Sequence, residues 1–166
     1  ALTLPYASAC FDVTLCHFLL LWLPDPVIAL QEMFRVTRPG GFVIALAEPD
    51  YGGRLDYPDE FARVSQQQTQ ALQQQGANPF LGRSLGHLLG SAGLINIQVG
   101  LIGGFWNRPP LPETLDLEWQ VLASDLADQY SPQELADLRE REQIAWQKNE
   151  RILYVPTFYG WGQVPG

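Results

Sequence analysis

The hydrophobic pattern begins with a nearly continuous apolar run from Phe11 to Leu21. Such a run, rich in branched and aromatic residues, is typical of a strand buried on both faces of a parallel sheet. A second run of this kind extends from Phe42 to Ala47. Between the two runs, apolar residues recur at three- and four-residue steps from Val27 to Phe34, which predicts an amphipathic helix.

Residues at both ends of this helix support the prediction. Asp25 suits the N-cap and Pro26 the first helical position, and the sequence Pro39-Gly40-Gly41 breaks the pattern. Strand, helix, tight turn and strand form a βαβ unit, in which the two strands run parallel. We therefore expect an α/β fold with Phe11–Leu21 beside Phe42–Ala47.

The rest of the chain alternates helices with strands. Alternation of apolar and polar residues from Ile95 to Ile102 predicts an antiparallel or half-exposed strand. The sequence Ser131-Pro132-Gln133-Glu134 has the form of a capping box and predicts a helix start. Expected helices cover Phe61–Gln75, Leu81–Ala92, Leu115–Tyr130 and Ser131–Asn149, and a last strand covers Arg151–Tyr159, before a Gly160-Trp161-Gly162 tail. We interpret residues 111–149 as a helical insertion or a lid.

Composition limits the classes of partner. The chain has 166 residues, a formal net charge of −8 and 46% hydrophobic residues, which fits one folded domain. The negative charge disfavours nucleic acid and anionic membrane surfaces, and no apolar run approaches the roughly 20 residues of a membrane-spanning helix. Cys10 and Cys16 have neither metal-ligand spacing nor the density of a disulfide framework, so we expect a cytoplasmic protein without a metal site.

The segment from Leu4 to Asp50 resembles the class I S-adenosylmethionine-dependent methyltransferases of the type 11 kind. The shared pattern consists of Leu4-Pro5-Tyr6, Phe11-Asp12, Cys16-His17, the aromatic and aliphatic stretch Phe18–Leu23, Pro24-Asp25-Pro26, Glu32, Arg35 and Pro39-Gly40-Gly41. The resemblance implies a Rossmann-like sheet that ends with an antiparallel strand. It also implies S-adenosyl-L-methionine as the methyl donor.

The family's glycine-rich cofactor loop and its ribose-binding acidic residue would precede Leu4 and are not found in this sequence. We therefore interpret residues 1–166 as a partial methyltransferase domain, the C-terminal half with strands four to seven. On this interpretation, the 166-residue chain alone binds the cofactor weakly and is inactive.

Ligands of open α/β sheets bind beyond the carboxyl ends of the strands, which places the expected site beside Cys16, His17 and Phe18. By resemblance, these three residues would contact the cofactor, and Ala1 and Leu2 would contact its adenine. His17 is the candidate catalytic base because imidazole accepts protons near neutral pH. The alternative is that His17 only fills a polar position.

The second buried run is followed by three candidate substrate residues. Glu48 and Asp50 end this strand, and Tyr51 comes next. The two carboxylates could orient an amine or hydroxyl of the substrate, and Tyr51 could line an apolar surface. The alternatives are that the charges are solvated or cap the chain and that the aromatic ring belongs to the core.

The favoured function is methyl transfer to a small molecule. The alternative is a non-catalytic chain that self-associates as a homodimer through the exposed edge of Phe11–Leu21, because an unpaired strand edge is a template for another strand. A third, weaker alternative is a nucleotide-dependent oxidoreductase, whose glycine fingerprint the sequence lacks.

Overall fold

The computed structural model describes residues 3–102 and 109–166, which divide into two compact units. Unit 1 comprises Ala1–Gly53, Gly76–Gly103 and Val155–Gly166, and unit 2 comprises Arg54–Gln75 and Gly104–Tyr154. The described part of the predicted insertion at 111–149 therefore belongs to unit 2. Its function as a lid stays a prediction.

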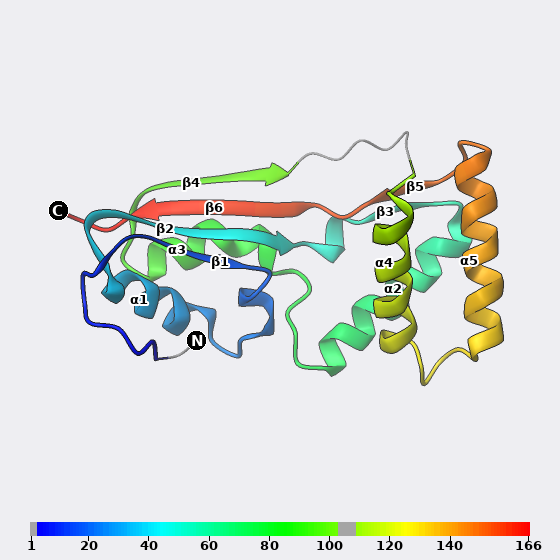
Figure 1. Cartoon of the computed structure of the whole chain (residues 1–166), viewed down its shortest axis with the longest axis horizontal. Coiled ribbons are helices and arrows are strands. Elements are labelled where there is room, and N and C mark those ends of the chain that lie inside the picture. Colours follow the sequence, from blue (N-terminus) through cyan, green and yellow to red (C-terminus); the bar gives the residue numbers. More distant parts are fainter. Residues whose placement is uncertain (1–2, 103–108) are drawn as a thin grey trace. The chain divides into compact units, whose positions relative to one another are not determined.

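Unit 1 contains a four-stranded sheet in the order β1-β2-β6-β4 (Figure 1). The strands are β1 (Phe11–His17), β2 (Thr37–Pro49), β4 (Ile95–Ile102) and β6 (Thr157–Gln163). β1 and β2 pair in parallel, whereas β6 is antiparallel to both β2 and β4. The predicted α/β class, the parallel pair and the final antiparallel strand are confirmed.

Helix α1 (Pro26–Val36) connects β1 to β2 and begins as the sequence predicts. The Asp25 carboxylate accepts the Val27 N–H at 3.0 Å, and Pro26 occupies the first turn. The helix continues directly into β2, so the predicted Pro-Gly-Gly turn lies inside this strand. A Cβ on Gly41 would lie 2.6 Å from the Asp12 carbonyl oxygen, so only glycine allows this close approach.

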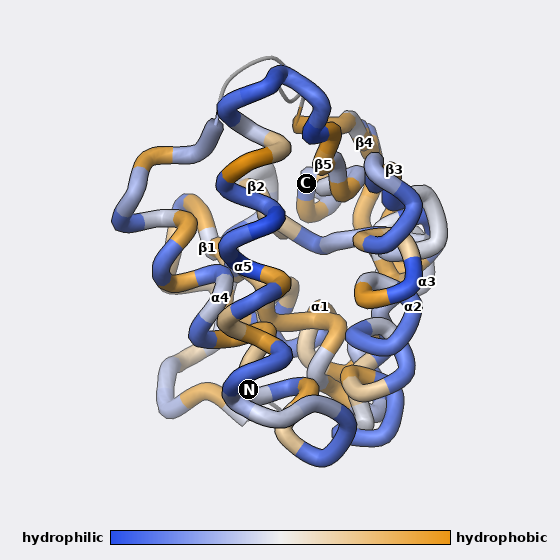
Figure 2. Tube along the Cα trace, turned by 90° about the vertical axis from the view of Figure 1, so that its right-hand side faces the viewer, coloured by the Kyte–Doolittle hydropathy of each residue, from blue (hydrophilic) through white to orange (hydrophobic). Residues whose placement is uncertain are grey.

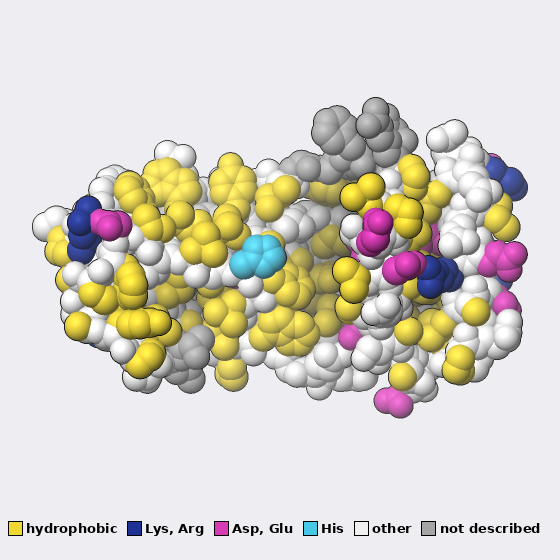
Figure 3. Space-filling view, in the orientation of Figure 1, with side chains coloured by type: hydrophobic (Ala, Val, Ile, Leu, Met, Phe, Trp, Pro, Cys, Tyr) yellow, Lys and Arg dark blue, Asp and Glu magenta, His cyan; other side chains and the backbone are white. Residues whose placement is uncertain are grey.

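Helices cover one face of the unit 1 sheet. Along β2, Val43 and Ala45 are fully buried, whereas Phe42, Ile44 and Leu46 are half-buried, which is the alternation of a sheet with one covered face. The covering helices are α1 and α3 (Leu85–Ser91), which contact each other as well as the sheet. Hydrophobic side chains gather over the strands of unit 1 in Figure 3.

The prediction that Phe11–Leu21 is one strand buried on both faces is wrong. Strand β1 ends at His17 and is an edge of the described sheet, and Val13 and Leu15 are 48% and 55% exposed. Leu20 and Leu21 lie instead in the 3-10 helix η1 (Leu20–Trp22), where both are completely buried. The apolar run therefore serves two elements in sequence, a strand and a buried turn.

Unit 2 combines a two-stranded antiparallel ladder with helices. Its elements are β3 (Leu55–Tyr57), α2 (Asp59–Gln74), α4 (Pro112–Asp125), α5 (Pro132–Gln147) and β5 (Ile152–Tyr154). Its apolar core consists of Phe61, Val64, Leu115, Trp119, Leu126, Leu135 and Leu138. Polar and apolar residues alternate along α4 and α5 in Figure 2, as expected of helices with one packed side.

The capping box at the start of α5 is confirmed, because the Ser131 and Glu134 side chains each accept the other residue's backbone N–H. The last predicted strand, Arg151–Tyr159, is wrong as a single element. Its residues divide between β5 and β6, which belong to different sheets. The expected tail at 160–162 is part of β6. The predicted helix Leu81–Ala92 begins with the 3-10 helix η3 (Leu81–Ser84), and α3 follows directly.

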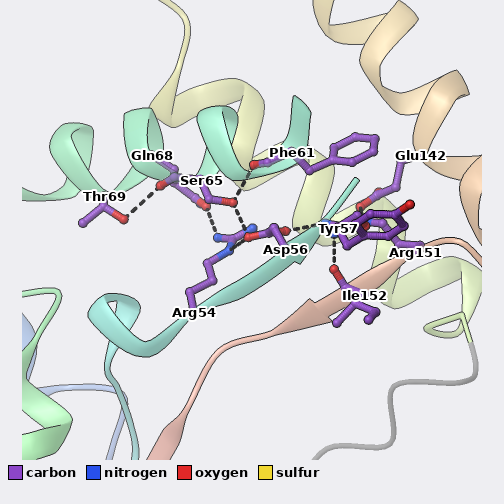
Figure 4. A network of polar contacts seen from close by, with 10 residues as sticks. All are labelled: Arg54, Asp56, Tyr57, Phe61, Ser65, Gln68, Thr69, Glu142, Arg151 and Ile152. Atoms are coloured by element: carbon purple, nitrogen blue, oxygen red, sulfur yellow. Dashed lines mark hydrogen bonds and ion pairs between the residues drawn. The ribbon is translucent and has the colours of Figure 1, made fainter. Parts of the chain in front are cut away.

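A buried polar network joins the two chain segments of unit 2 (Figure 4). Arg151 donates to Asp56 and to Glu142, both at 2.8 Å, and its guanidinium lies 4.5 Å from the centre of the Phe61 ring. Arg54 pairs with Asp56 at 2.6 Å. The network connects β3, α5 and the residue before β5 through buried charges that are paired with one another.

Within residues 3–102 and 109–166, every helix is too short or too polar to cross a membrane.

Candidate functional site

The carboxyl ends of β1 and β2 meet at one edge of the unit 1 sheet. His17 is the register partner of Leu46, and the Phe18 N–H donates to the Leu46 carbonyl oxygen at 2.9 Å. This edge holds the predicted site residues Cys16, His17 and Phe18, which we call the rim. The candidate substrate residues are at the carboxyl end of β2, where Glu48 is the next-to-last residue of the strand and Asp50 follows it directly.

Cys16 lies on the helix-covered side of β1 and is 6% exposed. Burial, and secondarily the nearby Glu48 charge, raise the pKa of its thiol to about 12. At neutral pH the side chain is therefore a protonated thiol, which packs as a small apolar group and is a poor nucleophile.

His17 and Phe18 are exposed at the rim, so both can meet a ligand from solvent. Alternation along β1 directs His17 toward the face that α1 and α3 leave open. Phe18 has φ +50°, a left-handed conformation that is unusual for a bulky residue, and its ring packs edge-on against Trp22 with centroids 6.3 Å apart. The catalytic role of His17 stays a prediction.

Glu48 is completely buried. Its Oε1 accepts the N–H groups of Leu19 and Leu20 at 3.1 and 3.0 Å, and its Oε2 accepts that of Leu21 at 3.2 Å. Desolvation raises the pKa of this carboxyl, and the three backbone hydrogen bonds and the nearby His17 oppose that shift. The contacts seen for Glu48 are thus to its own chain, and its role toward a substrate stays a prediction.

Asp50 is also buried and is held by Arg83. The guanidinium donates to both carboxylate oxygens, at 2.6 and 2.7 Å, and Asp50 raises the pKa of Arg83. The Gly52 N–H donates to the same carboxylate at 3.0 Å. Tyr51 is half-buried, with its N–H bound to the Pro79 carbonyl oxygen at 2.8 Å. The substrate roles of Asp50 and Tyr51 stay predictions, and the predicted adenine contacts Ala1 and Leu2 lie outside the described residues.

Contacts that were not predicted from the sequence connect two parts of the shared methyltransferase pattern, the Leu4-Pro5-Tyr6 segment and the Glu32–Arg35 pair. Glu32 accepts the Leu4 N–H at 2.8 Å, while Arg35 donates to Glu32 and to the carbonyl oxygens of Leu4 and Tyr6. The Arg35 hydrogen bond, followed by that from Leu4, lowers the pKa of Glu32 to about 2. The Leu-Pro-Tyr segment is therefore bound to α1, and the three-residue spacing of Glu32 and Arg35 was the available signal.

No group of three His, Cys, Asp or Glu side chains in the described part of the chain is arranged to hold a metal ion.

Sequence comparison finds similarity to methyltransferases over part of the chain. Residues 1–45 match the methyltransferase domain family. An uncharacterized methyltransferase of Schizosaccharomyces pombe is 42% identical over 83 residues, which are 49% of this chain and 30% of that protein. The resemblance to class I methyltransferases is confirmed. The ubiquinone/menaquinone biosynthesis C-methyltransferase of Bdellovibrio bacteriovorus is 54% identical over 43 residues, 26% of this chain and 18% of the relative.

Solved methyltransferase structures share the fold of the chain over nearly its whole length. A structure described as that of a candidate methyltransferase from Bacillus halodurans aligns with a TM-score of 0.54 at 13% identity, covering 99% of this chain and 69% of the other. Geranyl diphosphate methyltransferase in complex with SAM aligns with a TM-score of 0.51 at 13% identity, covering 98% and 54%. These solved structures show that the chain has a methyltransferase-like sheet. The chain spans less than a third of the length of the curated relatives that it matches.

Proposed function

We propose that this chain contributes to an S-adenosylmethionine-dependent methyltransferase that acts on a small molecule. The observation that carries the proposal is that residues 1–45, which match the methyltransferase family, contain β1 with the rim at its carboxyl end, α1 and the start of the parallel strand β2. The Bdellovibrio relative is named for C-methylation in quinone biosynthesis, which supports a small-molecule acceptor. The net charge of −8 favours such an acceptor over nucleic acid.

The rim residues fit contact with such a cofactor because His17 and Phe18 are exposed at the carboxyl edge of the sheet. S-adenosylmethionine supplies a methyl group on a sulfonium that is already a good leaving group. The contribution of the chain is then to orient the acceptor and the donor in line, which accounts for most of the rate in such a reaction. His17 would accept the proton that the acceptor loses.

Binding at the rim can be tested by titrating the isotopically labelled chain with S-adenosylhomocysteine and following backbone amide signals by NMR. We expect weak binding, with shifts concentrated at residues 16–18. Absence of any shift at millimolar ligand, or shifts confined to other elements, would contradict the proposed site.

The role of His17 can be tested by the pH dependence of methyl transfer in a longer protein that joins this chain to the family's glycine-rich cofactor loop. If His17 is the base, the rate of this longer protein rises with pH, because only a neutral imidazole can accept a proton. His17→Gln should lose this rise and reduce kcat by roughly 10²- to 10⁴-fold. The matched control is His87→Gln, since His87 is exposed on α3. An unchanged pH profile in His17→Gln removes the residue from the mechanism.

The alternative function, self-association, is favoured by a second observation. Strand β1 has a neighbour on one side only in the described chain, and Val13 and Leu15 are exposed on its open face. Antiparallel pairing of two copies about Thr14 would place Val13 opposite Leu15 of the second copy, which gives apolar cross-strand pairs. We propose a second copy of this chain as the occupant because the neighbouring residues on that face are uncharged: Phe42, Ile44, Leu46, Tyr159 and Trp161.

Light scattering coupled to size exclusion tests this pairing. The parent chain should be a dimer at tens of micromolar, and Leu15→Lys should be a monomer because the charge would be buried against its copy. Leu117→Lys, at a 62% exposed position of α4, is the matched control and should stay dimeric. A parent chain that stays a well-behaved monomer at high concentration would refute the dimer.

A further inference from the structure

The buried carboxylate of Glu48 reaches from β2 to the chain segment that follows β1. Three backbone N–H groups, those of Leu19, Leu20 and Leu21, converge on its two oxygens at 3.0 to 3.2 Å. These donors are 27 to 29 residues away in sequence. Glu48 thus contacts consecutive amides of a turn that belongs to another part of the fold.

The turn needs an acceptor from elsewhere. The first N–H groups of a helical turn lack partners within the turn, and Leu19, at the N-cap of η1, makes no side-chain cap. Leu20 and Leu21 are completely buried, so water cannot substitute. An unmade hydrogen bond at a buried N–H is unfavourable, and the Glu48 carboxylate removes that cost for Leu20 and Leu21 while also binding the N–H of the half-buried Leu19.

The same turn continues from the rim. The Phe18 N–H is bound to the Leu46 carbonyl oxygen, and the next three N–H groups are bound to Glu48. Phe18 keeps its left-handed conformation between these two attachments. The Leu21 carbonyl oxygen is also fixed, because it accepts the Asn78 N–H at 2.7 Å.

We propose that Glu48 is a positioning residue that acts through the backbone of residues 19–21 to hold His17 and Phe18 in the orientation needed at the rim. This inference assigns Glu48 an internal role instead of a substrate contact, and its consequence for ligand binding rests on the proposed function. A carboxylate is required because both of its oxygens accept. A glutamine amide would present a donor to one of the backbone donors.

The structural part of the inference is tested without ligand by hydrogen exchange. Glu48→Gln should exchange the amides of Leu19, Leu20 and Leu21 at least tenfold faster than the parent, with the amide of Val43 in β2 as the internal reference for global stability. Glu140→Gln, at an exposed position of α5, is the matched control and should leave all of these rates unchanged. Unchanged protection at residues 19–21 in Glu48→Gln would overturn the inference.

A measurement on the parent chain covers the case in which Glu48→Gln does not fold. Scalar couplings through hydrogen bonds should connect the Glu48 carboxyl carbon to the backbone nitrogens of Leu20 and Leu21, and their absence in the folded parent would overturn the inference.

The functional part uses the S-adenosylhomocysteine titration. Shifts at His17 and Phe18 should be lost in Glu48→Gln and kept in Glu140→Gln. If the parent shows no ligand shifts while Glu48→Gln still loses amide protection, the proposed function fails and the structural role of Glu48 stands. Equal changes in the amide chemical shifts of His17 and Phe18 on ligand addition, in the parent and in Glu48→Gln, would refute the positioning role.

Discussion

Residues close together in sequence differ widely in chemical environment at the rim. Cys16 is buried with a strongly raised thiol pKa, whereas His17 and Phe18 are exposed. The period of a strand explains the difference between Cys16 and His17, since consecutive side chains point to opposite faces, whereas Phe18 follows β1 and has a left-handed backbone conformation. Sequence reasoning could place all three residues at a strand end, but it could not determine which of them faces solvent.

The two cysteines should differ in reactivity for the same reason. Cys10 is exposed and Cys16 is buried, and the Cys16 pKa of about 12 leaves almost no thiolate at pH 8. Iodoacetamide should therefore modify Cys10 in the folded chain and Cys16 only after denaturation, as followed by mass spectrometry. Equal modification of both in the folded chain would show that Cys16 is not buried as described.

The candidate carboxylates show where inference from sequence stops. Glu48 and Asp50 were predicted at the end of a strand, and in the structure Glu48 is the next-to-last residue of β2 and Asp50 follows β2 directly. Their partners, the Leu19–Leu21 amides and Arg83, are distant in sequence and are brought near only by the folded chain. The position of a charge could thus be predicted from a local pattern, whereas its hydrogen-bond partners could not.

At the scale of elements, strongly periodic segments were predictable and short ones were not. Helix α1 and strand β4 appear where their apolar spacing and caps indicate. Strand β3 has only three residues and carries no periodic signal. The apolar run from Phe11 was misassigned at its end because a buried 3-10 turn and a buried strand both require apolar residues.

Close packing of η3 against β2 gives a prediction for two glycines. A Cβ on Gly82 would lie 2.5 Å from the Phe158 ring and 2.7 Å from the Glu48 carbonyl oxygen, whereas a Cβ on Gly86 would meet only Val99, at 3.4 Å. Gly82→Ala should lower the free energy of unfolding by about 1–3 kcal/mol through overpacking. Gly86→Ala, inside α3, should leave it unchanged or raise it by up to about 1 kcal/mol. Urea denaturation measures both, and equal effects would refute the packing argument.

At the scale of the whole molecule, stability in acid should depend on Glu32. Its pKa is lowered from 4.5 to about 2 in the folded chain, so its contribution to stability is complete above about pH 4.5 and is lost as the pH falls toward 2. Thermal unfolding between pH 5 and 2 should show a shallower decline of Tm for Glu32→Gln than for the parent. Glu140→Gln, exposed on α5, should follow the parent, and a Glu32→Gln curve parallel to the parent would contradict this origin.

The architecture of each unit was only partly accessible from sequence. A parallel pair with a final antiparallel strand could be inferred from the motif, and it is present. The division into two units could not be inferred from the sequence. Unit 2 is built from two stretches that are far apart in the chain, and the Arg151 network joins them.

The place of β6 has a consequence for the order in which the protein forms during synthesis. This strand is translated last among the described elements, yet it separates β2 from β4 in the sheet. While the ribosome is still making residues before Thr157, β4 has no neighbour to pair with and β2 can pair only with β1. A premature stop codon there would leave nascent chains with β4 unpaired and one edge of β2 open, so such products should be recognised by chaperones and proteases rather than accumulate.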